Sequence, residues 1–153
     1  MKRYYIAYGS NLNVRQMKFR CPTAKIVGTA VIGDYELLYK GSKTGSYLTI
    51  EKKKGSVVPV AVWEVTAADE HNLDIYEGYP NFYYKKNMKI RLSEIGKMID
   101  AFVYIMHEER RFGIPTSAYV STCKFGYTIF GFDFKYLDEA YEKSLKGVAN
   151  NEK

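Results

Sequence analysis

Several features that would classify this chain at once are scarce or missing from its 153 residues. Its two cysteines, Cys21 and Cys123, are too few for a disulfide framework and lack the spacing of metal ligands. The apolar run near the N-terminus breaks at Gly9, which makes it too short for a signal peptide or a membrane span. We therefore expect a cytoplasmic protein with no membrane partner.

The usual catalytic signatures are also missing. The chain has no G-x-S-x-G, no P-loop and no H-E-x-x-H. Its two histidines, His71 and His107, are followed by acidic residues, and two histidines alone do not make a metal site. We interpret both as surface residues and Cys123 as a small buried hydrophobe. The sequence therefore predicts neither a metal ion nor a cofactor.

What is present is typical of a globular protein. The composition is 46% hydrophobic and 26% charged, and the length fits a single domain, which we place at residues 1–147 with a flexible tail at 148–153. Aromatic residues make up 16% of the chain, including 15 Tyr. Tyrosine suits a wall that is half in contact with water better than a dry core.

The net charge of +6 raises the possibility of a nucleic-acid partner. The basic residues are scattered, however, and their one run, at 52–54, precedes Gly55 and resembles the tip of a hairpin. We interpret this run as a solvated turn and predict no nucleic-acid partner. A non-catalytic barrel that stacks single-stranded nucleic acid, or another ligand, on its tyrosines is kept as a second hypothesis.

The pattern of β-type residues predicts an α+β fold. Helices are expected at 14–19, 66–78, 116–131 and 133–147, and the second has a capping pair, Thr66 and Asp69, and a stop at Gly78. We expect 46–51 and 57–65 to pair as a hairpin, with Pro59 at an edge or a bulge. So many short strands favour a small, mostly antiparallel β-barrel with one inserted helix and C-terminal helices. The predicted strands lie at 3–8, 24–33, 35–40, 46–51, 57–65, 81–92 and 98–106.

Glu77 is oddly placed for a carboxylate. It lies in the last turn of the predicted helix, where the macrodipole is negative and raises a carboxyl pKa slightly. Burial against the neighbouring Tyr76, Tyr79 or Phe82 would raise that pKa further, and such a glutamate can act as both base and acid. A solvated glutamate at a helix end is the simpler interpretation, and the residues alone leave both open.

A second candidate is the turn at residues 8–12, where a predicted strand runs into a glycine and then into a helix. Backbone N–H groups in such a turn can converge on an anion. A plain connection between strand and helix is the simpler interpretation, since a single Gly-Ser turn is weak evidence for an anion site.

Three segments together resemble the gamma-glutamylcyclotransferase family. They are "YIAYGSNL" near the N-terminus, "YEGY" at the end of the second helix, and the long closing segment that begins "PTSAYVSTCKFGY". The similarity covers nearly the whole chain. It implies a small β-barrel with flanking helices and an intramolecular reaction, in which the α-amine of a γ-glutamyl group attacks its own γ-carbonyl and releases 5-oxoproline and an amine.

The resemblance also implies which residues act. Glu77 corresponds to the essential glutamate, and Tyr119 to a pocket contact in the closing segment. Backbone amides of the glycine turn would hold the glutamyl group. The residues of that turn are Tyr8, Gly9, Ser10, Asn11 and Leu12.

The implied partner is a small γ-glutamyl compound, bound by a monomer or a homodimer. Because the nucleophile belongs to the substrate, the reaction needs no serine, cysteine, metal or cofactor. The leaving group is left open between an amino acid, an amine and a larger natural product. We expect residues 41–47 and 78–80 to line the pocket near it.

Overall fold

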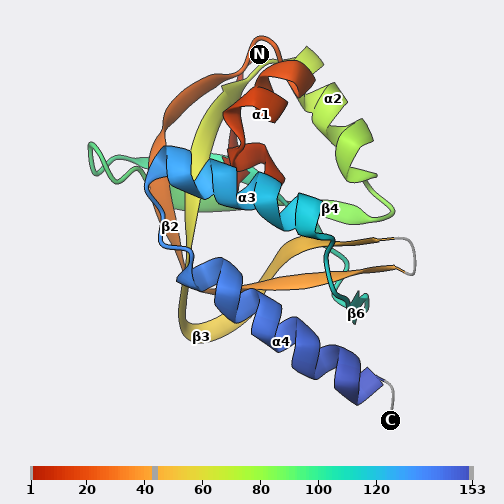
Figure 1. Cartoon of the computed structure of the whole chain (residues 1–153). Helices are drawn as coiled ribbons and strands as arrows, with labels where there is room; N and C mark the ends of the chain where they lie inside the picture. Colours follow the sequence, from red (N-terminus) through yellow and green to blue (C-terminus); the bar gives the residue numbers. More distant parts are fainter. Residues whose placement is uncertain (1, 43–44, 152–153) are drawn as a thin grey trace.

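The computed structural model describes residues 2–42 and 45–151, whose strands form one curled sheet flanked by helices (Figure 1). The order across the sheet is β4-β5-β1-β3-β2-β6, and all neighbours are antiparallel except β1 and β5. The predicted α+β fold with a mostly antiparallel, barrel-like sheet is confirmed as a half-barrel of mixed strands. The six strands of the described chain are β1 (Arg3–Ala7), β2 (Lys25–Ser42), β3 (Gly45–Val65), β4 (Tyr83–Arg91), β5 (Met98–Met106) and β6 (Arg111–Phe112).

The predicted hairpin at the lysine run is wrong. Strand β3 continues through it, and the segments on either side of the lysines both pair with β2 rather than with each other. Residues 53–56 are opposed by Asp34 alone, which has φ of 61° and accepts a hydrogen bond from the Gly55 N–H at 3.0 Å. This irregularity accommodates the turn-forming residues without reversing the chain, so four predicted strands merge into two.

Pro59 lies in β3, an interior strand, yet its place is compatible with proline. The pairing of β3 with β1 ends at Ala61, so at Pro59 only β2 is a neighbour. This is the local edge that a residue without an N–H requires.

The helices begin and end close to where their capping residues predict. Thr66 and Asp69 form a complete capping box, and Gly78 ends the helix with φ of 64°. The last helix runs past the predicted end at Gly147. That glycine has no positive φ and lies against Phe112, where a Cβ would come 2.3 Å from the ring, so it serves close packing rather than a helix stop. Residues 148–151 of the expected tail are therefore helical, and 152–153 lie outside the described chain. The helices are η1 (Ser10–Leu12), α1 (Val14–Arg20), α2 (Ala67–Glu77), α3 (Ser117–Phe130) and α4 (Lys135–Asn151).

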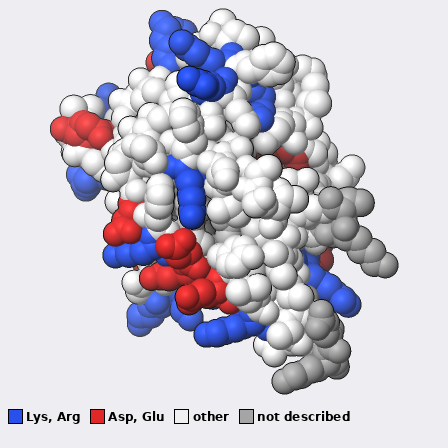
Figure 2. Space-filling view, in the orientation of Figure 1, with Lys and Arg blue, Asp and Glu red and all other residues white. Residues whose placement is uncertain are grey.

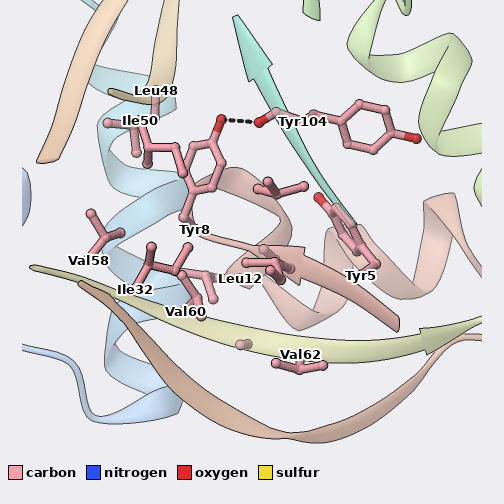
Figure 3. Packing of buried hydrophobic residues seen from close by; sticks show 14 of the residues in the cluster. Tyr5, Tyr8, Leu12, Ile32, Leu48, Ile50, Val58, Val60, Val62 and Tyr104 are labelled. Atoms are coloured by element: carbon pink, nitrogen blue, oxygen red, sulfur yellow. Dashed lines mark hydrogen bonds between the residues drawn. The ribbon is translucent and has the colours of Figure 1, made fainter. Parts of the chain in front are cut away.

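The core lies on the concave side of the sheet. Figure 3 shows aliphatic side chains such as Leu48, Val58 and Val60 packed around Tyr8, with Tyr5 and Tyr104 beside them. Helix α3 crosses this side, and α4 packs on β2 and β6 (Figure 1). The core therefore changes from aliphatic to tyrosine-rich toward the end of the sheet where β1 meets η1.

Candidate active site

A cavity of about 470 Å³ opens at this tyrosine-rich end. Half of the described residues that line it are aromatic, and Glu77 is the one charged residue among them. A mostly apolar wall with a few polar groups is the usual character of a small-molecule site. The lining residues are Tyr5, Ile6, Tyr8, Gly9, Ser10, Asn11, Tyr47, Leu48, Ile75, Tyr76, Glu77, Gly78, Phe82, Tyr83, Tyr104 and Tyr119.

The glycine turn forms one wall of the cavity. The chain leaves β1 at Tyr8, turns at Gly9 and enters η1, where Ser10 and Asn11 are buried. The N–H of Leu12 donates to the Gly9 carbonyl at 3.0 Å. Since the first N–H groups of a helical turn have no partner within it, the amides of Ser10 and Asn11 are the ones left for another acceptor.

A close contact between backbones holds this turn in place. Gly126 of α3 lies against it so tightly that a Cβ there would be 2.5 Å from the Leu12 carbonyl carbon and 2.8 Å from the Asn13 nitrogen. Asn13 in turn caps α1 by accepting from the Gln16 N–H at 3.2 Å. Helix α3 therefore acts as a rigid support behind the turn.

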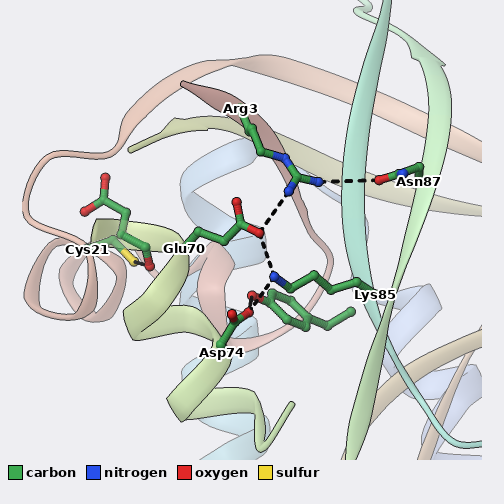
Figure 4. A network of polar contacts seen from close by, with 8 residues as sticks. Arg3, Cys21, Glu70, Asp74, Lys85 and Asn87 are labelled. Atoms are coloured by element: carbon green, nitrogen blue, oxygen red, sulfur yellow. Dashed lines mark hydrogen bonds and ion pairs between the residues drawn. The ribbon is translucent and has the colours of Figure 1, made fainter. Parts of the chain in front are cut away.

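Helix α2 forms the facing wall, and its acidic residues follow one stripe. Glu70, Asp74 and Glu77 are four and three residues apart, which places them on neighbouring turns of one side of the helix. Lys85 of β4 pairs with the first two, at 2.6 Å from Glu70 and 2.8 Å from Asp74, and Arg3 adds a contact to Glu70 at 3.1 Å (Figure 4). These ion pairs fasten α2 to the sheet.

Glu77 has a different environment from the other two. No hydrogen bond or ion pair to its carboxyl group is present in the described chain, and the residue is half-buried against the cavity. Burial raises the pKa of Glu77 from its ordinary value of 4.5 to about 8, while the positive charge of Arg20 acts in the opposite direction. At neutral pH this carboxyl group is therefore close to the balance point between donating and accepting a proton.

The tyrosines around Glu77 are held by their hydroxyl groups. Tyr8 donates to the Tyr104 carbonyl at 2.7 Å, and Tyr83 donates to the Leu48 carbonyl at 2.8 Å. The Tyr119 hydroxyl accepts from the Leu48 N–H at 3.1 Å. Because each ring is fixed by a backbone partner, the cavity wall keeps its shape before any ligand binds.

The structure brings most of the predicted site residues together. Glu77 and Tyr119 line the cavity, as do Tyr8, Gly9, Ser10 and Asn11. Leu12 is the exception, because its side chain is fully buried and its N–H is already bonded to Gly9. In the turn of residues 8–12, it supports the wall without forming its surface.

Outside these residues, the sequence predictions were less complete. Of the expected pocket stretches, 41–47 contributes Tyr47 and 78–80 contributes Gly78, while 43–44 lie outside the described chain. Tyr5, Tyr83 and Tyr104 were not anticipated. The large number of tyrosines was the only signal for them, and it does not say which strands meet.

Charged side chains and possible metal ligands are distributed over the described part of the surface. In Figure 2 the Lys and Arg side chains of the visible face form separate groups with Asp and Glu among them. In the described residues, no three or more His, Cys, Asp or Glu are grouped so as to hold a metal ion. The same part of the chain has no helix long and apolar enough to cross a bilayer.

Comparison with known proteins agrees with this geometry. Human gamma-glutamylcyclotransferase is 32% identical over 110 residues, which are 67% of this chain and 58% of the human protein. A solved structure of a gamma-glutamyl cyclotransferase superposes with a TM-score of 0.81 at 26% identity, covering 92% of this chain and 86% of the other. The structure of an uncharacterised human protein gives 0.80 at 26% identity, covering 91% and 86%.

The family model described as "Gamma-glutamyl cyclotransferase, AIG2-like" matches residues 5–121. This range includes the glycine turn, Glu77, Tyr119 and every strand except the first two residues of β1. The match extends over more than half of the sequence, and the chain therefore belongs to the gamma-glutamyl cyclotransferase, AIG2-like family.

Proposed function

We propose that this protein is a cyclotransferase that converts a small γ-glutamyl amino acid to 5-oxoproline and the free amino acid. The observation that carries the proposal is the position of Glu77. Its half-buried carboxyl group, which has no partner in the described chain, lines the same cavity as the turn of Ser10 and Asn11. The cavity volume of about 470 Å³ lies within the range usual for small-molecule sites.

In the proposed reaction, the α-amine nitrogen of the substrate attacks its own γ-carbonyl carbon. A C–N bond forms and closes the five-membered lactam, and the C–N bond to the leaving amine breaks. Glu77 takes a proton from the attacking nitrogen and returns it to the leaving nitrogen, so the carboxyl group ends as it began. One residue can serve both steps because its pKa of about 8 is close to the working pH.

The chain's own contribution is to fold and hold the substrate. The attacking and accepting atoms are already in one molecule, and effective molarities for well-oriented reactions of this kind reach about 10⁵–10⁸ M. The amides of Ser10 and Asn11 are suited to hold the α-carboxylate or the oxyanion that develops on the γ-carbonyl. The fixed tyrosine rings, including Tyr8 and Tyr119, limit how far the bound chain can extend.

The test is a panel of γ-glutamyl amino acids, γ-glutamylamines and glutathione, scored for release of 5-oxoproline. Glu77→Gln is expected to lower turnover by about 10²–10⁴-fold, the usual contribution of general acid–base catalysis. Glu139→Gln, which removes an exposed carboxylate on α4, serves as the matched control and is expected to behave as wild type. Wild-type turnover by Glu77→Gln would refute the role of Glu77, and release from amines alone would reassign the leaving group.

A further inference from the structure

Arg20 lies beside the cavity and has no role in the reaction described above. It is the last residue of α1, it is half-buried, and no carboxylate of the described chain lies within ion-pair distance of it. Its guanidinium group instead donates to the side-chain oxygen of Asn11 and, at 3.1 Å, to that of Gln16. The guanidinium carbon also lies 3.4 Å from the centre of the Tyr76 ring.

These contacts join the two walls of the cavity. Asn11 belongs to the glycine turn, and its side-chain amide donates to the Tyr5 hydroxyl at 2.8 Å. Tyr76 belongs to α2 and immediately precedes Glu77, and its hydroxyl lies 3.1 Å from the Ser10 hydroxyl. Arg20 therefore reaches Asn11 directly and Ser10 through Tyr76.

We propose that Arg20 is a positioning residue that ties the Ser10–Asn11 turn to the last turn of α2, and so fixes the distance between the amides and the Glu77 carboxyl group. The inference rests on the proposed function. Arginine suits the position because a planar guanidinium can stack on a ring with its face while its edge donates several hydrogen bonds. A lysine would keep the charge but not both contacts.

The charge of Arg20 has a second consequence. The groups that interact with Glu77 from the surrounding elements are Tyr5 of β1, Tyr8 directly after that strand, Tyr83 of β4 and Tyr104 of β5. Burial raises the pKa of each of these tyrosines, so all are neutral near pH 7. Arg20 is then the cation that favours the ionised form of Glu77, and it lowers a pKa that burial raises.

The experiment separates the two effects with two substitutions. Arg20→Gln removes the charge and the guanidinium group that stacks on Tyr76. Arg20→Lys keeps the charge but loses the planar guanidinium group that both stacks and donates to Asn11 and Gln16. Arg15→Gln is the matched control, because Arg15 is on the same helix, is exposed and stacks on Phe125 instead, 5.6 Å from its centre. The readouts are a ¹³C NMR titration of the Glu77 carboxyl group and the pH profile of kcat/KM.

In Arg20→Gln, the titration midpoint of Glu77 and the midpoint of the kcat/KM profile are expected to move to higher pH together. Each pH unit of movement lowers kcat/KM at pH 7 by about tenfold, since the ionised fraction falls by that factor. In Arg20→Lys the midpoint stays near that of wild type, while kcat/KM falls by about 10–100-fold at every pH because the turn is misplaced. Arg15→Gln changes neither readout.

Several results would overturn the inference. If the midpoints of the Glu77 titration and of the kcat/KM profile stay unchanged in Arg20→Gln, the charge of Arg20 does not act on Glu77. If Arg20→Lys has the kcat/KM of wild type, Arg20 does not position the turn. A loss of folding would move the NMR midpoint of Glu77 down toward its ordinary value of 4.5, which is the opposite direction. Arg20→Lys is the variant to use if Arg20→Gln does not fold. If wild type releases no 5-oxoproline from any substrate, the proposed function fails, and the NMR titration still decides whether Arg20 acts on Glu77.

Discussion

Replacing Glu77 by glutamine is expected to change how stability depends on pH as well as activity. In wild type the pKa of Glu77 is about 8 when folded, against an ordinary value of 4.5 when unfolded. Between these values the folded protein binds one more proton than the unfolded chain, so the free energy of unfolding falls as pH rises. The contribution is full below 4.5 and is lost as pH rises through about 8. Glutamine does not titrate and lacks this dependence.

The size of the effect follows from the same two values. One pKa unit corresponds to about 1.36 kcal/mol. The free energy of unfolding of wild type should therefore fall by about 3 kcal/mol more than that of Glu77→Gln between about pH 5.5 and about pH 8.5. This is an upper limit, because the residue is only half-buried and water screens part of the cost. Native domains have about 5–15 kcal/mol in total, so the difference is large enough to measure.

The assay is urea unfolding of both proteins at the two pH values. All other titrating groups are shared, so they cancel when the pH dependence of the variant is subtracted from that of wild type. Glu70→Gln provides a contrast, since Glu70 is ion-paired with Lys85 and Arg3 and its loss should lower stability. Parallel pH curves for wild type and Glu77→Gln would show that the carboxyl group is as well solvated when folded as when unfolded, and would refute the reasoning.

Three further predictions follow from the site. The kcat/KM of wild type should rise with pH to a midpoint near 8, because the base must be ionised, and a profile flat from about pH 6 to 9 would contradict this. Gly126→Ala should lower the free energy of unfolding by about 1–3 kcal/mol, because the added Cβ would overlap Leu12. This loss is expected even though alanine usually favours helices over glycine. Unchanged urea unfolding would contradict the close contact. Lys85→Met should cost about 2–3 kcal/mol in the same measurement, a value between those of exposed and buried pairs, because Asp74 loses its ion pair and Glu70 keeps only Arg3. No loss of stability would contradict the ion pairs.

Local signals were enough to predict helices α1 to α4 and one half of the site. The capping box of Thr66 and Asp69, with Gly78 as stop, located α2 and therefore placed Glu77 at its end. The glycine turn was visible for the same reason, since it depends on consecutive residues. The lysine run misled because a bulge and a hairpin use the same residue types, and they are distinguished by the pairing of both flanking segments with β2.

Long-range pairing decided the rest. Tyr47, Tyr83 and Tyr104 come from three different strands, and no local pattern says which of the many tyrosines face one cavity. Arg20 was hidden for another reason. A basic residue in the last turn of a helix is favoured by the helix dipole alone, so its presence there does not indicate a second role. Its stacking on Tyr76 depends on how α1 and α2 are packed, which the sequence does not show.

The acidic stripe of α2 shows how one helix provides both an anchor and a proton carrier. Lys85 reaches Glu70 and Asp74 and forms an ion pair with each of them. Glu77, one turn further, receives only the more distant charge of Arg20, and burial therefore dominates its pKa. A lysine at ion-pair distance would lower that pKa and make the carboxylate too weak a base to accept a proton from an amine. The negative end of the helix dipole acts in the same direction as burial, so the position that is unfavourable for the stability of a carboxylate is favourable for its basicity.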